Sequence, residues 1–167
     1  MQIYPFVLEM KKLLRNLDAC IDKAVAYAET RKFDPNVLVN ARLAPDMFTF
    51  TKQIQNACDS AKFAVALTTG REPPSHPDTE QTIPELKQRI ATVVRYLDEY
   101  SEKDFADIAS RSVTRPRWEG KKMTAPSYFV EHAQPNFYFH LMAAYAILRH
   151  NGVDIGKRDY LGQLTWA

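Results

Sequence analysis

The segment "PNFYFHLMAAYAILRHNG", residues 135–152, gives the clearest indication of architecture in the chain. No formally charged residue stands between Asn136 and Leu148, and one histidine lies among aromatic and small apolar side chains. In a helix, where successive residues are about 100° apart, one side collects a mostly apolar stripe: Asn136, Phe137, His140, Ala143, Ala144, Ile147 and Asn151. The pattern predicts a helix from about Asn136 to His150 that directs His140 into a helical core.

The opposite side of this helix is also poorly suited to water. It carries Tyr138, Met142, Tyr145 and Arg149 at steps of four, three and four residues. A helix that is apolar all round is either wrapped by other elements or presents its second face to a partner. We therefore expect a homodimer.

Three earlier segments show the same helical period. The first spans residues 2–30, the second begins around Pro45 and ends at Gly70, and the third follows the capping box of Thr82 and Glu85 in "TIPE". The third helix should bury a stripe of Leu, Ile and Val and keep Arg89 on its wet side.

The connections complete the expected topology. The segment "GREPPSHPD", residues 70–78, holds three prolines and predicts a stiff crossing between the second and third helices. The helical period is lost over residues 101–126, where a short two-stranded excursion around 110–125 is expected, and "SYFVEH" reads as one or two turns before Pro135. The sequence thus predicts a single all-α domain, residues 1–167, built as a four-helix bundle with a long Pro-rich crossover.

Composition restricts the partners. The formal net charge is +2, from 22 Lys and Arg against 20 Asp and Glu, which argues against nucleic acid. The basic cluster from Arg111 to Lys122 around Trp118 reads as a solvated hairpin or loop rim, with a polyanion footprint as the alternative. No apolar run is long enough for a membrane span and no signal-peptide pattern opens the chain, so a cytoplasmic location without membrane contact is expected.

Three motifs together resemble one known family. They are "LAPDMFTFTKQIQNACD", "PNFYFH" and "AYAILRHNGVDIGKRDYLG". They resemble the DinB/YfiT-like superfamily of metal-dependent bundles, and look like an uncharacterised bacterial branch of it with a domain of unknown function. The resemblance implies an up-down-down-up bundle, commonly dimeric, with a central pocket for a divalent metal such as nickel or zinc. Some members of the superfamily are thiol-dependent transferases or isomerases.

The sequence departs from the metal-binding pattern of that superfamily. His140 matches the second histidine of the last helix, but Asn136 stands in the place of the first. The second helix offers hydrocarbon on its core side, and its polar pair Gln55 and Asp59 is expected to be solvated. A metal ion bound by protein nitrogen needs at least three ligands, so we expect no cofactor or a weakly held nickel or zinc ion on His140 and Asn136. The alternatives are a buried polar cluster around His140, or a small-molecule pocket without metal.

The residues after the last helix are dense in charge. Two interpretations stay open: the segment folds back over the bundle as a clasp, or it rims a pocket and binds an anionic substrate. The candidate pocket residues are Asn136, His140, Tyr145, Arg149, His150, Asp154 and Lys157. The first function hypothesis is small-molecule binding or transferase-like activity with an incomplete metal site. The alternative is a non-catalytic, stress-associated interaction module with a vestigial site, and whether the chain is an enzyme is left open.

Overall fold

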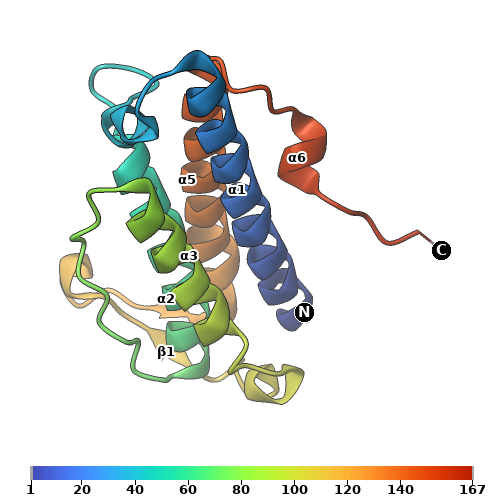
Figure 1. Ribbon diagram of the computed structural model, residues 1–167. Helices are drawn as coiled ribbons and strands as arrows, with labels where there is room; N and C mark the ends of the chain where they lie inside the picture. The colour runs from blue at the N-terminus through green and yellow to red at the C-terminus, as the bar shows by residue number, and fades with distance from the viewer. Residues whose placement is uncertain (1, 167) are drawn as a thin grey trace.

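Four long helices form an up-down-down-up bundle in the computed structural model, which describes residues 2–166 (Figure 1). They are α1 (Tyr4–Arg31), α2 (Phe50–Thr69), α3 (Ile83–Leu97) and α5 (Gln134–His150). α1 packs against α3 and α5, and α2 packs against the same two helices. α1 and α5 run in one direction while α2 and α3 run in the other, so the predicted all-α bundle is confirmed.

The second helix begins later than the sequence suggested. Residues Pro35–Asn40 form a short 3₁₀-helix, η1, and α2 starts at Phe50, not near Pro45. The Thr49 side chain accepts a hydrogen bond from the Lys52 amide at 3.3 Å, and the Phe50 amide donates to the Ala41 carbonyl at 2.8 Å. Thr49 therefore caps the helix, while Pro45 stays in the preceding loop. The other end is as predicted, because Gly70 adopts a φ of 76° and stops the helix.

The Pro-rich crossover returns the chain along the bundle from the end of α2 to the start of α3 (Figure 1). α3 then begins with the predicted capping box. The Glu85 amide donates to the Thr82 hydroxyl at 3.4 Å, and the Thr82 amide donates to the Glu85 carboxylate at 2.9 Å. Two of the amides at the start of this helix are satisfied in this way.

The expected β excursion is confirmed. After a 3₁₀-helix η2 (Glu102–Phe105), strands β1 (Ser112–Val113) and β2 (Met123–Thr124) pair antiparallel, with Ser112 opposite Thr124. Another 3₁₀-helix, η3 (Pro116–Trp118), lies between them. Glu119 and Gly120, both with positive φ, turn the chain back toward β2.

The last long helix begins at Gln134, two residues before the predicted start. A turn of α-helix, α4 (Ala125–Ser127), leads into a π-helix, η4 (Tyr128–Ala133), which continues directly into α5. Pro135 lacks an amide hydrogen, and its ring would crowd the carbonyl four residues earlier in a regular α-helix. The wider π turn accommodates the proline, so the helical segment continues through it.

The core lies between the four helices. Its largest fully buried side chains include Met10, Leu14, Ile21, Phe50, Ile54, Leu86, Ile90 and Phe137. The predicted stripe of α5 holds for its apolar members, since Phe137, Ala144 and Ile147 are buried. His140 is only half-buried, at the edge of the core rather than inside it.

The charged tail folds onto α1. It contains a short helix, α6 (Lys157–Leu161), in which Asp159 pairs with Lys23 at 2.7 Å. The Asn16 side-chain amide donates to the Tyr160 carbonyl at 2.9 Å. These contacts support the clasp interpretation of the tail. Across residues 2–166, no helix combines the length and apolarity that crossing a membrane requires.

Candidate functional site

A polar cavity of about 380 Å³ lies between α2 and α5, and we call it the α2–α5 cavity. One wall comes from α2 and the residue before its cap: Phe48, Lys52, Asn56, Asp59, Ser60 and Phe63. The β1–β2 excursion, η4 and α5 supply the remainder: Arg115, Arg117, His132, Asn136 and His140. Charged, amide and imidazole groups from four parts of the chain therefore meet at one place.

A buried glutamine determines which ring nitrogen of His140 carries the hydrogen. The Nδ1 atom of His140 lies 2.8 Å from the Oε1 atom of Gln53, whose side chain is 1% exposed. A carbonyl oxygen only accepts, so Nδ1 carries the hydrogen, and in the neutral ring Nε2 then keeps its lone pair. Burial, reinforced by the positive charge of Lys52, lowers the pKa of His140. The imidazole is therefore neutral and offers an acceptor nitrogen at Nε2.

The neighbour of His140 on α2 is thus polar, and the expectation of hydrocarbon there is wrong. Gln55 is also buried, at 4% exposed, and donates to Glu80 at 2.9 Å, so the expectation that it is solvated is wrong as well. A signal for this wall exists in the sequence. Gln53, Asn56 and Ser60 are uncharged polar residues at steps of three and four, which places them on one side of the helix.

His132 is the second imidazole of the cavity. Its Nε2 atom lies 3.3 Å from Nη2 of Arg117. Because a guanidinium only donates, Nε2 accepts and Nδ1 carries the hydrogen. Burial is the main cause that lowers the pKa of His132, and the positive charges of Arg115 and Arg117 lower it further. The ring is held by stacking on Tyr128, with centroids 5.5 Å apart.

The cavity's carboxylate belongs to an ion network whose cations, Arg89 and Lys62, are buried. Asp59 accepts from Arg89 at 2.9 Å and from Lys62 at 2.8 Å. Arg89 also pairs with Glu80 at 3.0 Å and Asp78 at 3.3 Å, which holds the crossover against α2 and α3. The Arg89 side chain is 3% exposed, so its expected position on the wet side of α3 is wrong. Its charge is tolerated inside because carboxylates surround it.

The donor set of the cavity does not fit a tightly bound metal ion. Asn136 donates its side-chain amide to the His132 carbonyl at 2.6 Å, so its amide oxygen and Nε2 of His140 are the two atoms of the expected pair that could still bind an ion. Within residues 2–166, no group of three or more His, Cys, Asp or Glu side chains could hold an ion. Lys52, Arg115 and Arg117 add positive charge to the same cavity. A weakly held nickel or zinc ion on His140 and Asn136 stays a prediction.

The structure separates the other candidate pocket residues from Asn136 and His140. Tyr145 packs edge-on against Tyr160, with centroids 5.8 Å apart, and Arg149 donates to the Val153 carbonyl at 3.4 Å. Arg149, His150, Asp154 and Lys157 are exposed at or beyond the end of α5. None of these five residues lines the α2–α5 cavity.

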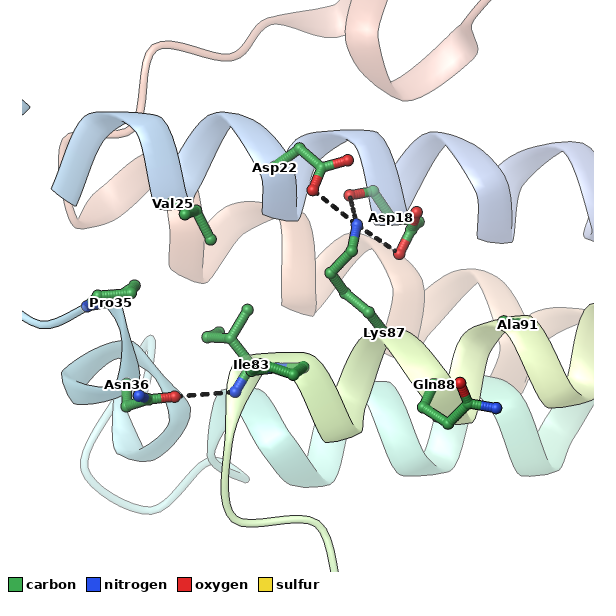
Figure 2. A pocket seen from close by; sticks show the side chains of 10 residues that line it. Asp18, Asp22, Val25, Pro35, Asn36, Ile83, Lys87, Gln88 and Ala91 are labelled. Atoms are coloured by element: carbon green, nitrogen blue, oxygen red, sulfur yellow. Dashed lines mark hydrogen bonds and ion pairs between the residues drawn. The ribbon is translucent and has the colours of Figure 1, made fainter. Parts of the chain in front are cut away.

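A larger cavity, of about 600 Å³, opens between α1 and α3 near η1 (Figure 2). Its charged groups satisfy each other, because Nζ of Lys87 projects between Asp18 and Asp22 at 2.9 and 2.7 Å. The Asn36 side chain accepts the Ile83 amide at 2.9 Å. The charges of this larger cavity therefore neutralise each other, whereas Nε2 of His140 in the α2–α5 cavity has no partner among the described residues, and we take the latter cavity as the candidate site.

The His140–Gln53 pair gives a first prediction. Replacing His140 with leucine should lower the free energy of unfolding by about 1–3 kcal/mol, because the buried Gln53 oxygen loses its donor. The double replacement His140→Leu with Gln53→Leu should recover most of this loss, since both polar groups are then removed. Urea unfolding followed by circular dichroism measures both. A single variant as stable as the native chain would show that the pair adds nothing to folding.

The chain matches both a family model and a solved structure. The model of a family described as a domain of unknown function (DUF1993) matches residues 5–161. A crystal structure of a DinB family member protein from Shewanella denitrificans is 50% identical in sequence and superimposes with a TM-score of 0.93. The match covers 96% of this chain and 92% of that one. No match was found among curated proteins.

Proposed function

Because the chain belongs to the DinB family and carries the DUF1993 domain over residues 5–161, we propose that it binds a small organic molecule in the α2–α5 cavity. The observation that carries the proposal is the His140–Gln53 pair. Gln53 holds the ring by Nδ1, at 2.8 Å, so that Nε2 is free to accept a hydrogen bond from a bound molecule. A volume of about 380 Å³ lies within the range of roughly 300–1,000 Å³ usual for small-molecule sites.

Other groups in the cavity would fix the orientation of such a molecule. The side chains of Asn56, Asn136 and Ser60 supply amide and hydroxyl groups along the walls. Phe48 stacks on His140, with ring centroids 6.4 Å apart, and covers one side of the imidazole with an apolar surface. Ligand sites usually combine an aromatic surface with a few polar groups that fix the orientation of the bound molecule.

The proposal is limited to binding. A transferase-like reaction that used a protein nucleophile would need that nucleophile within hydrogen-bond reach of a base. Ser60 is the hydroxyl of the cavity, and in the described part of the chain no hydrogen bond joins it to His132 or His140. The contacts of the imidazoles therefore favour a ligand-binding role over this form of group transfer.

A thermal-shift screen tests the proposal. The native chain is melted with small organic acids, amides, amines and thiols, and with nickel and zinc salts. A compound that binds should raise the melting temperature, because it stabilises only the folded state. The shift should disappear in His140→Ala and Asn136→Ala and persist in Tyr145→Ala, which changes a residue outside the cavity.

The possible outcomes separate the alternatives. Stabilisation by metal alone, lost in His140→Ala, would support the weak metal site. A screen without hits, or hits that survive both cavity variants, would contradict ligand binding and favour the non-catalytic interaction module with a vestigial site.

We also propose that two copies pair through α5. On the outer face of this helix Phe139 is 59% exposed and Met142 is 48% exposed, and adjacent apolar side chains of this size are typical of interaction surfaces. The mass of the native particle, measured by light scattering, tests the homodimer.

A further inference from the structure

Two arginine side chains line the α2–α5 cavity without a carboxylate partner. They are Arg115 and Arg117, from the excursion between β1 and β2. The guanidinium of Arg115 lies over the Phe63 ring, 4.5 Å from its centroid, and Arg117 contacts the neutral His132. In residues 2–166, neither arginine forms a salt bridge. Arg115 is half-buried, and Arg117 lies at the exposed rim of the cavity.

The negative charge of the cavity compensates these two groups only in part. Asp59 is its carboxylate, and that carboxylate already accepts from Arg89 at 2.9 Å and Lys62 at 2.8 Å. Lys52 adds a third positive charge to the wall, although it pairs with Asp78 of the crossover. The cavity therefore has an excess of positive charge beside its aromatic surface.

Partial burial makes the charge of Arg115 unfavourable. Arg115 is half-buried, and the loss of water around its guanidinium lowers its pKa. A partly desolvated charge without a counter-charge costs free energy, which an anion bound against it would offset. The planar fork of a guanidinium matches the two oxygens of a carboxylate or of a phosphate.

We infer that the ligand of the α2–α5 cavity carries an oxyanion, a carboxylate or a phosphate, which Arg115 and Arg117 bind. This inference rests on the proposed function and makes it more specific. The oxyanion lies against the β1–β2 excursion, and the rest of the ligand extends toward Asn136 and the free Nε2 of His140. The basic cluster thus serves a small anion inside the bundle and not an extended polyanion on its surface.

Isothermal titration of the full chain tests the inference with three probes: benzoate, its neutral analogue benzamide, and inorganic phosphate. We expect benzoate or phosphate to bind and benzamide to bind at least tenfold more weakly. Arg115→Gln and Arg117→Gln should each weaken anion binding at least tenfold. Lys121→Gln and Arg111→Gln, which remove exposed charges of the same excursion outside the cavity, should change it less than twofold. Whichever anion binds more tightly identifies the oxyanion.

The failure of this inference differs from the failure of the proposed function. Equal binding of benzoate and benzamide, or anion binding unchanged in both cavity variants, would overturn the oxyanion assignment and leave a ligand site in place. The oxyanion assignment alone would also be overturned if neither anion binds while a neutral compound is a hit in the thermal-shift screen. Absence of any ligand in either experiment would overturn both. Circular dichroism of the two arginine variants confirms that they fold, and Arg115→Lys, which keeps the charge without the fork, should restore only part of the affinity.

Discussion

Replacing Arg89 with methionine should lower the free energy of unfolding by about 3–5 kcal/mol, because it removes the buried central cation of an ion network. The guanidinium pairs with Asp59, Glu80 and Asp78 at 2.9–3.3 Å while its side chain is 3% exposed. Without it, Lys62 remains as the cation buried beside these carboxylates. Urea unfolding measures the loss, and the Pro-rich crossover should become more sensitive to proteolysis in the variant.

Arg95→Met is the matched control for this prediction. Arg95 lies on the same helix, is exposed, and its side chain donates to the Thr92 hydroxyl at 3.3 Å. A surface replacement of this kind should change the stability by no more than about 0.5 kcal/mol. If the two variants lose the same stability, the network does not hold the crossover.

Phe137→Ala should cost a similar amount, about 3–5 kcal/mol, because it leaves a cavity in a close-packed core. Phe137 is 0% exposed and lies on the side of α5 that faces the bundle. The control is two residues away. Phe139 is 59% exposed, so Phe139→Ala should change the stability of the monomer by no more than about 0.5 kcal/mol.

The comparison of these two phenylalanines tests which face of α5 is buried. Equal losses would mean that the helix is rotated from the described orientation. Light scattering of the Phe139→Ala protein also reports on the proposed pairing, since a dimer that uses this face should dissociate while each bundle remains folded.

The parts of the fold that sequence could predict depend on local information. The stop at Gly70, the capping box of Thr82 and Glu85 and the β excursion each involve residues close together in the chain, and each is present. The predicted start of α2 near Pro45 is wrong because two nearby sequence signals compete. A proline is allowed in a first turn, but the Thr49 side chain forms the actual cap.

The site was less predictable because its partners are distant in sequence. His140 and Asn136 could be identified from the last helix alone, and both line the cavity. The partner of His140 is Gln53, 87 positions away, and Arg89 reaches Asp59 across 30 positions. The sequence predicts a solvated hairpin or loop rim for the basic cluster, but the position of this segment over the cavity depends on how it packs. Side-chain periodicity places a residue on a face of its helix without identifying what lies opposite.

The π-helix η4 has a consequence for how this protein can diversify. A π turn holds roughly one residue more than an α turn, so it offsets the helix before it from the helix after it by about 100°. The rotation of His132 and the preceding hairpin about the helix axis is therefore independent of the rotation that buries one face of α5. Gain or loss of that single residue would therefore change the direction of the His132 side chain at the cavity wall. The buried face of α5 would keep its packing in the bundle.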